Sequence, residues 1–443
     1  MPLDPATLHD LDVLSTSTPR GPTLLSLVDR TRSRAGREAL RQRLVAPGDS
    51  AEGILALQCA HQSLAADAAS YRAIFDRTDT DAAERYLNSN WQLPSARPAL
   101  KRFMEGLWRP RWFRGYLREI GNGQFCIMSL VRAAGDLSSR LSATKAESLQ
   151  ELGAKLAALL SVRDAQGLLD LGGRESTSAQ VAFDQLARDA AKPLLFEIIG
   201  HLGTVEAMWS FGVATAEHGW SYPRPAAQLR TTGLFHPFLG RRAVPNDLHL
   251  DDRTRVCFVT GPNMAGKSTF LKAVGVAVLL AHAGCGVPAV SMEFATVRTI
   301  FSSVQIVDNL SAGESFYLAE VRRIRSLAVA IHDHGSAVAV LDEPFRGTNV
   351  HDAAEATLAV ISRLIAHPAA LVFIASHLAE IVPSLVDDPR VCLLHFSADV
   401  TTERPLFDFH LRKGISAQRL GMTLLKQEGV LELLDRSPVE AGR

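Results

Sequence analysis

The sequence contains no pair of cysteines in CxxC spacing, and its five cysteines are scattered along the chain (Cys59, Cys126, Cys257, Cys285 and Cys392). It therefore indicates neither a zinc site nor a disulfide framework, and it fits a reducing compartment. No charge of one sign dominates, because Lys plus Arg and Asp plus Glu number 47 each. The whole-chain charge thus gives no support to non-specific nucleic-acid binding, and any DNA contact must come from a local patch.

Long hydrophobic runs are also missing. The most apolar stretch, residues 273–290, is interrupted by His282, Pro288 and three glycines, so it predicts a buried helix with its exit loop rather than a membrane span. The first residues do not show the basic segment and apolar run of a secretory signal. We therefore expect a cytoplasmic protein with no membrane partner, and the length of 443 residues predicts two or three domains.

The pattern of apolar residues changes near residue 235. Before it, leucines recur at helical spacing and strand-like runs are few. After it, apolar runs alternate with helical segments, which is typical of a sheet with helical crossovers. We predict a helical domain over residues 1–235 and an α/β domain over 236–443. The predicted strands are residues 255–260, 299–304, 337–341, 371–376 and 391–396.

A glycine-rich loop over residues 261–269 matches the pattern G, any four residues, G-K-[ST]. A strand-type run precedes it and a predicted helix, residues 269–283, follows it, so the loop would deliver a polyphosphate to a helix N-terminus. Lys267 would hold the β/γ-phosphates and Ser268 would bind Mg²⁺. The predicted ATP-binding residues are Gly261, Pro262, Asn263, Met264, Ala265, Gly266, Lys267, Ser268 and Thr269.

Two later strands predict the remaining chemistry. An apolar run ends in Asp342 and Glu343, at the strand tips where open α/β sheets bind ligands. Asp342 would bind Mg²⁺ and Glu343 would polarise the attacking water as a general base. His377 follows the next strand and could donate a hydrogen bond to the γ-phosphate. The alternatives are a strand that ends in solvated acids and a histidine that merely lies on the surface.

A segment of small residues and hydroxyls, residues 310–315, precedes a helical run. One reading is an ordinary helix N-cap. The other is a signature segment that completes the phosphate site of a second subunit. The residues themselves leave these two readings equally open.

Together these segments resemble the MutS family of DNA mismatch repair ATPases. Residues 260–269 (TGPNMAGKST) look like the family's TGPNMxGKST, and residues 342–348 (DEPFRGT) resemble its DEIGRGT stretch. Residues 374–377 (IASH) are similar to a strand that ends in a Thr-His pair, and residues 308–315 parallel a DDLASGRS segment. Further likenesses, to the closing segment and to the helical lever domain, lie at residues 407–421, 3–7, 24–31 and 81–87.

The resemblance implies a fold and an assembly. We expect a helical lever domain followed by a P-loop ATPase domain of the ABC-like class, with a C-terminal dimerisation segment. It also implies a homodimer through the ATPase domains, in which Ser315 completes the partner's site and the nucleotide state moves the levers. Lys267, Glu343 and His377 then serve catalysis, while Ser268 and Asp342 hold Mg²⁺.

The chain also departs from the family pattern. It begins where the lever begins, so we expect no mismatch-recognition or connector domain, and the helical part looks too short for the DNA-gripping clamp. Ala243 stands where the family usually has an aromatic that packs on adenine, so Phe409 is a candidate for that contact. Pro344 and Phe345 replace the usual Ile-Gly, which removes no catalytic group.

Two basic segments are candidates for a DNA surface. Residues 101–118 mix Lys and Arg with aromatic side chains, which could track phosphates and stack on bases. The alternative, which we favour, is that their aromatic side chains pack into the helical core. Residues 30–43 carry six arginines, and we expect these to lie on a solvated or salt-bridged helix face.

The sequence therefore predicts a MutS-like, DNA-binding ATPase that uses ATP and Mg²⁺ and has no intrinsic mismatch readout. One alternative is a nucleotide-switched module that binds a partner protein and no DNA. A weaker alternative is an ABC-type ATPase subunit, which Asn263 and Met264 in the loop argue against.

Overall fold

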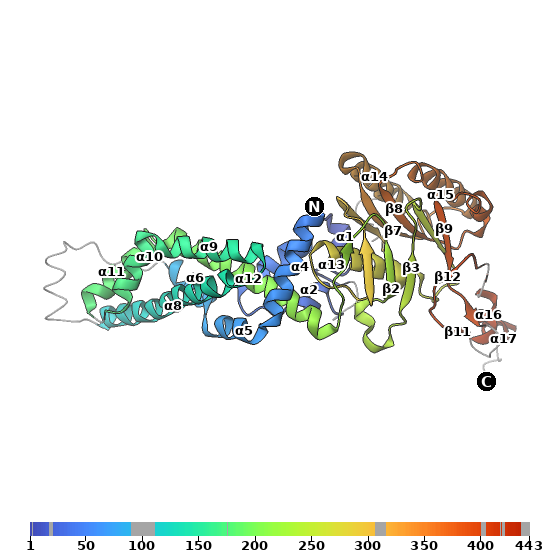
Figure 1. The fold of residues 1–443 in the computed structure, drawn as a ribbon. Helices are drawn as coiled ribbons and strands as arrows, with labels where there is room; N and C mark the ends of the chain where they lie inside the picture. The colour runs from blue at the N-terminus through green and yellow to red at the C-terminus, as the bar shows by residue number, and fades with distance from the viewer. Residues whose placement is uncertain are drawn as a thin grey trace, which may run out of the picture. The chain divides into compact units, whose positions relative to one another are not determined.

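The chain is described here from a computed structural model. The described residues are 1, 3–16, 21–89, 111–174, 176–305, 316–399, 405–416, 418 and 421–435. The chain forms two compact units. One comprises residues 1–24, 44–51 and 219–443, and the other comprises residues 25–43 and 52–218. We call them the α/β unit and the helical unit (Figure 1).

The helical unit consists of amphipathic helices around one large apolar core, with a small separate cluster at Tyr116 and Ile120. Two of its helices are much longer than the others, α8 (Arg111–Ser142) and α12 (Lys192–His218), and they contact each other. Buried Leu, Ile, Ala and aromatic side chains from most of the helices fill the core. The remaining helices are α2 (Leu24–Val28), α3 (Arg34–Val45), α4 (Ala51–Ala66), α5 (Ala68–Arg77), α6 (Thr80–Leu87), α9 (Glu147–Ser161), α10 (Arg163–Gly172) and α11 (Thr177–Arg188).

A buried carboxylate joins the start of α3 to α12. Glu206 lies 2% exposed, and its Oε1 accepts hydrogen bonds from the backbone N–H groups of Arg32 and Ser33. The Ser33 hydroxyl donates to the other oxygen. Because these donors replace water, the acid is satisfied in the core, although burial raises its pKa. Gly203 allows α12 and the start of α3 to approach closely, because a Cβ at this position would lie 2.7 Å from the backbone of Ala35.

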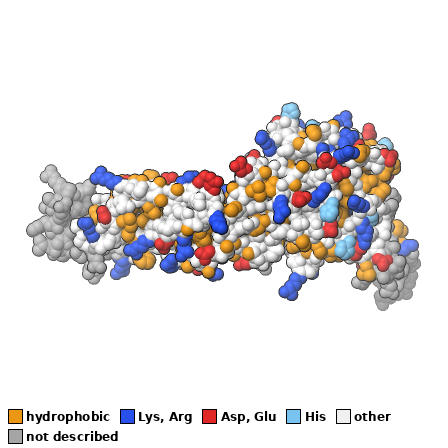
Figure 2. Space-filling view, viewed as in Figure 1, with side chains coloured by type: hydrophobic (Ala, Val, Ile, Leu, Met, Phe, Trp, Pro, Cys, Tyr) orange, Lys and Arg blue, Asp and Glu red, His pale blue; other side chains and the backbone are white. Residues whose placement is uncertain are grey.

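The arginines between residues 30 and 43 are largely engaged by acids, as the sequence predicted. Arg30 pairs with Glu217 at 2.7 Å, and Arg41 pairs with Glu38 at 2.8 Å. Arg32 and Arg37 also have acidic partners. On the face seen in Figure 2, Lys and Arg side chains alternate with Asp and Glu side chains rather than gathering in one patch.

The segment predicted to mix basic and aromatic residues is only partly described. Residues 101–110 lie outside the described part of the chain, and α8 begins at Arg111. Tyr116, on α8, is 6% exposed and donates its hydroxyl to Asp184 at 2.9 Å. For this ring the core-packing alternative therefore holds.

The α/β unit is built on a six-stranded sheet in the order β12-β9-β4-β8-β7-β6. Strands β6 to β9 and β4 run parallel, and β12 (Arg412–Lys413) pairs antiparallel with β9 at the edge. All five predicted strands are present. They are β4 (Val256–Thr260), β6 (Thr299–Ser303), β7 (Ala337–Asp342), β8 (Ala370–Ala375) and β9 (Val391–His395).

Helices cover both faces of this sheet, so its strands read as continuous apolar runs. Side chains of α14 (Phe316–His334) and α15 (Val350–Leu364) share one core with alternate residues of β4, β7 and β8. On the other face α13 (Lys267–His282) is buried almost all round. A helix that is apolar on every side must be enclosed by protein, and α13 is the helix that leaves the glycine-rich loop.

The other elements of the α/β unit are short. A four-stranded sheet has the order β1-β5-β2-β3, and the small pair β10-β11 is antiparallel. The elements are α1 (Pro5–Asp10), β1 (Arg224–Pro225), β2 (Arg230–Leu234), η1 (Pro237–Arg242), β3 (Asn246–His249), β5 (Ser291–Phe294), η3 (Ala379–Ser384), β10 (Ala398–Asp399), β11 (Leu406–Phe407), α16 (Gly421–Gln427) and α17 (Val430–Asp435).

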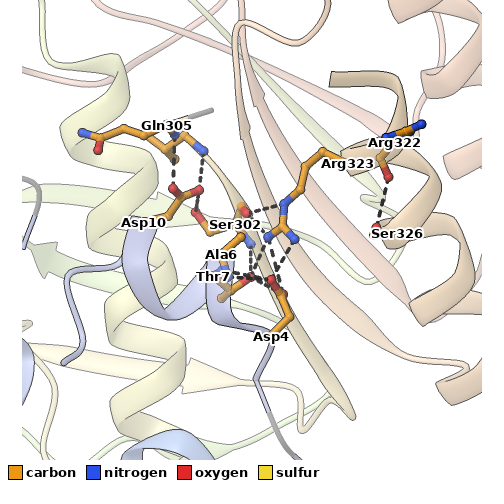
Figure 3. A network of polar contacts seen from close by, with 10 residues as sticks. Asp4, Ala6, Thr7, Asp10, Ser302, Gln305, Arg322, Arg323 and Ser326 are labelled. Carbon is orange, nitrogen blue, oxygen red and sulfur yellow. Dashed lines mark hydrogen bonds and ion pairs between the residues drawn. The ribbon is translucent and has the colours of Figure 1, made fainter. Parts of the chain in front are cut away.

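The first helix of the chain, α1, is bound to the C-terminal end of β6 by a polar network (Figure 3). Asp10 is 2% exposed, and its carboxylate accepts from the backbone N–H of Val304 at 2.7 Å and from the Ser302 hydroxyl at 3.2 Å. Arg323 of α14 donates to Asp4 at 2.8 Å and stacks its guanidinium over a ring of β6. These contacts fix α1 as a structural part of the α/β unit.

This attachment differs from the predicted domain boundary. We expected residues 1–235 to be helical and separate, but residues 1–24 and 44–51 belong to the α/β unit, and the rest of that unit begins at Gly219. The difference arises because α1 makes its contacts with residues about 300 positions away, which no local pattern reveals. The combination of a helical unit with an α/β unit is as predicted. Within the described residues, no helix is both long and apolar enough to cross a membrane.

Candidate functional site

The glycine-rich loop joins β4 to α13, and two of its glycines are required by the backbone. Gly261 has φ of +141°, and a Cβ there would lie 2.6 Å from the carbonyl oxygen of Phe396. Gly266 is the N-cap of α13 and is left-handed, with φ of +106°. Met264 adopts a left-handed φ of 68° without being glycine, and its side chain is 73% exposed. The loop is therefore a tight, pre-shaped turn that ends at a helix N-terminus.

Lys267 is the first residue of α13, and its ammonium group crosses back over the loop. Its Nζ donates to the carbonyl oxygens of Gly261, at 2.9 Å, and Pro262, at 3.2 Å. The side chain is buried, which lowers its pKa, while the carboxylates of Glu343 and Asp342 oppose that shift. A cation held at the centre of such a loop is placed to meet a phosphate group.

Asp342 lies at the tip of β7 and has an unsatisfied oxygen. Its Oδ1 is buried and has no hydrogen-bond partner. Burial raises the pKa of the carboxyl group, and the neighbouring Ser268 hydroxyl lowers it. An orphaned carboxylate oxygen beside a hydroxyl is a donor set that suits Mg²⁺, which takes few protein ligands and completes its shell with phosphates and water. In the described part of the chain, no group of three or more His, Cys, Asp and Glu side chains could hold a metal alone.

Glu343 lies beside His377, and the two residues follow the neighbouring strands β7 and β8. Glu343 has a left-handed backbone with φ of 48°, and its N–H donates to the carbonyl of Ala375 on β8 at 2.8 Å. Its Oε1 lies 3.4 Å from His377 Nδ1. Glu343 thus follows β7 directly, and its side chain contacts a histidine that lies just beyond the end of β8.

A cavity of about 650 Å³ opens over the loop, which is within the usual range for ligand pockets. Phe409 forms part of its wall, and its ring approaches the position that a Cβ on Gly266 would occupy. Asn246 on β3 fixes this wall, because its amide donates to the carbonyl of Phe409 at 3.0 Å and accepts from Leu411 at 2.6 Å. The aromatic that we predicted for the nucleotide base therefore lies at the cavity and is held there. The lining comprises Leu234, Phe235, His236, Leu239, Arg242, Val244, Asn246, Asn263, Met264, Gly266, Lys267, Ser268, Thr269, Phe270, Ala273, Asp342, Glu343, Arg346, Phe396 and Phe409.

Several residues of the cavity were missed by the sequence analysis. His236 lies in the wall, and burial lowers its pKa to about 4, so the ring is neutral near pH 7. Arg346 also lines the cavity, and its backbone N–H is held by the buried Glu320 of α14 at 3.2 Å. Asn246 is the third. The local patterns around these residues are those of ordinary loops and strands, so only the DEPFRGT likeness pointed toward Arg346.

Most predicted site residues converge here. The cavity lining includes most of the loop together with Asp342, Glu343 and Phe409, and His377 contacts Glu343 from the segment that follows β8. The proposed signature serine, Ser315, lies outside the described residues, as does the whole of residues 306–315. Ala243 closes η1 at the edge of the cavity and contributes no ring.

Comparison with known proteins points to one family. Residues 257–435 match the family model of MutS domain V. The DNA mismatch repair protein MutS 2 of Halobacterium salinarum is 32% identical to the chain over 241 residues. That alignment covers 53% of this chain and 28% of the relative, so the chain spans well under half of that protein's length. The matched domain contains the loop, both strand-tip acids and the cavity wall at Phe409.

Proposed function

We propose, from the match of residues 257–435 to MutS domain V and the likeness to a MutS 2 protein, that the chain is a Mg²⁺-dependent ATPase that works as a homodimer and acts on DNA. The observation that carries this proposal is the convergence of Lys267, Asp342 and Glu343 on one cavity over a helix N-terminus. The adenine base then lies against Phe409, and the phosphates lie in the loop.

In this mechanism each side chain has one task. Lys267 would leave its loop carbonyls and bind the β/γ-phosphates. Ser268 and Asp342 would hold Mg²⁺, which would supply positive charge against the phosphate oxygens. Glu343 orients the attacking water and accepts its proton, and His377, within reach of Glu343, donates to the γ-phosphate.

The dimer is proposed from two features. Ser315 completes the partner's phosphate site, as in the family. The C-terminal helices α16 and α17 carry exposed apolar side chains, with Leu433 63% and Leu434 77% exposed, and we propose that they pack against the partner chain. ATP binding then draws the ATPase domains together, and the helical unit serves as the lever.

The test of this function is the ATP hydrolysis rate of the purified protein, with Mg²⁺ or with a chelator, and with Lys267→Ala as the control. We expect hydrolysis that requires Mg²⁺ and is lost in the variant. At least one of three added DNAs, a duplex, a mismatched duplex or a branched DNA, should raise the Mg²⁺-dependent rate of ATP hydrolysis by the wild-type protein. A Lys267→Ala variant that hydrolyses ATP at the wild-type rate would refute the assignment.

A second candidate function is a nucleotide-switched module that binds a partner protein and no DNA. It is favoured by the engagement of Arg30, Arg32, Arg37 and Arg41 with acids, since paired arginines are poor phosphate binders. The two functions separate in a binding assay with a labelled duplex. Binding that weakens steeply with salt supports DNA, and no binding at low salt supports the module.

A further inference from the structure

Two of the five cysteines are direct neighbours in the central sheet. Cys257 on β4 and Cys392 on β9 are register partners in a parallel pair of strands. Side chains of register partners leave the sheet on the same face, so the two thiols lie side by side. Both are free thiols in this structure. The nucleotide mechanism uses neither of them.

The spacing of the strands allows these thiols to be joined. Neighbouring strands lie about 4.7–4.9 Å apart, and disulfides span Cα separations of about 4.4–6.8 Å. The Cβ atoms of a disulfide approach to about 3.5–4.5 Å, so closure draws β4 and β9 slightly together. A disulfide whose formation requires the two strands to shift is strained, and small thiols reduce strained disulfides easily.

The surroundings give the two sulfurs different reactivities. Cys257 is fully buried, and burial raises the pKa of its thiol. The hydrogen bond from that thiol lowers the pKa of Cys392, which is only partly buried, and Lys413 on the edge strand β12 lowers it further. Cys392 is thus the more nucleophilic and the more accessible sulfur of the pair.

We propose that Cys257 and Cys392 form a reversible disulfide site that responds to low-molecular-weight disulfides such as oxidised glutathione. The Cys392 thiolate attacks one sulfur of the small disulfide, whose S–S bond breaks and releases one thiolate. The Cys257 sulfur then attacks the mixed disulfide at Cys392, and its proton goes to the second departing thiolate. The protein loses two thiols, and the small disulfide is reduced to two thiols.

The position of the pair ties this chemistry to the phosphate loop. β4 runs directly into Gly261, and β9 runs directly into Phe396, whose carbonyl oxygen closely faces Gly261. The backbone N–H of Phe396 also donates to Thr260 at 3.0 Å. The cross-link therefore fixes the register of the two strands that shape the loop.

The experiment maps disulfides in the folded wild-type protein after incubation with graded concentrations of oxidised glutathione, by mass spectrometry of peptides. We expect a peptide pair joined through Cys257 and Cys392 that excess reduced glutathione separates again. The exposed Cys59 is the internal control and should carry a glutathione adduct in the same sample. The proposal is wrong if Cys59 is fully modified while Cys257 and Cys392 both remain free thiols.

Two variants test the order of the steps. In Cys257→Ser the glutathione adduct should persist on Cys392, because no second sulfur removes it. In Cys392→Ser the buried Cys257 should stay a free thiol. Modification of Cys257 in that variant at the wild-type rate would overturn the proposed order. If either variant fails to fold, disulfide mapping of the wild-type protein decides on its own. A Cys257–Cys392 disulfide that forms in denaturant but not in the folded protein would also contradict the proposal.

Discussion

Asp342 and Glu343 are adjacent in the chain but meet different surroundings. Asp342 ends β7 with a buried, unpartnered oxygen, whereas Glu343 turns away through a left-handed backbone and reaches His377. Residues forced into this region cost free energy and persist where the surrounding structure holds them. The two adjacent carboxylates therefore have different surroundings, which agrees with the different roles that we propose for them.

Replacing Glu343 by glutamine should separate ATP binding from hydrolysis. The amide keeps the size and the contact with His377 but cannot accept a proton, so kcat should fall by about 10²–10⁴-fold with little change in ATP affinity. Single-turnover hydrolysis and equilibrium binding of a fluorescent ATP analogue measure the two quantities. Glu355→Gln, at an exposed position on α15, is the matched control and should leave both unchanged. Equal losses of binding and hydrolysis would contradict the role of Glu343.

The neutral His236 should make stability depend on pH. Burial lowers its pKa from 6.5 to about 4, so the unfolded chain takes up this proton at a higher pH than the folded one. The stability that the neutral His236 ring provides is fully present above about pH 6.5 and is lost as the pH falls toward about 4. The loss amounts to about 3 kcal/mol in the free energy of unfolding.

Urea unfolding between pH 7.5 and pH 4 tests this dependence. His236→Asn keeps a side-chain acceptor for the N–H of Phe238 and removes the titrating ring, so its stability should fall less over the same interval. An identical pH profile for the variant and the wild type would show that another group is responsible.

At the scale of elements, the sequence was most informative where local and global structure agree. The five parallel strands of the large sheet are mostly apolar runs, and each was predicted within a residue or two of its observed ends, whereas the exposed two-residue edge strand β12 was not predicted. The loop motif likewise gave the correct strand, turn and helix. The contact between Asn246 and Phe409 could not be predicted from the sequence, because a side chain on β3 binds the backbone of a segment that lies far along the chain. The same physical reason, contact between distant segments, hid the true position of α1.

Helix packing in the helical unit depends on one close approach. At Gly203 of α12 a Cβ would lie 2.7 Å from the backbone of Ala35, so Gly203→Ala should force the segments apart and cost about 1–3 kcal/mol. Gly200, one turn earlier on the same helix, has nothing within 4 Å of the same position, so Gly200→Ala should stabilise the helix by about 0.5–1 kcal/mol. Chemical denaturation of both variants makes the comparison, and equal effects would refute the packing argument.

At the scale of the whole molecule, mixing two inactive variants tests the proposed dimer. Lys267→Ala lacks a working loop and Ser315→Arg lacks a working signature segment, so a mixed dimer has one intact site. Random mixing in equal amounts should restore about a quarter of the wild-type rate of ATP hydrolysis, since half the dimers are mixed. Each variant alone is the control, and a mixture no more active than the two controls together would contradict a shared site.

The polar network around α1 also constrains how the protein is made. Asp4 and Asp10 reach the ribosome exit first, but their partners Ser302 and Arg323 follow about 300 residues later. At about 5–20 residues per second, the first helix waits about 15–60 s for the residues that hold it. The helical unit is complete in the nascent chain by His218, so it can fold during that interval. A fragment that starts after Leu24 would keep every nucleotide-site residue yet leave Arg323 without its carboxylate, and we expect such a fragment to be prone to aggregation.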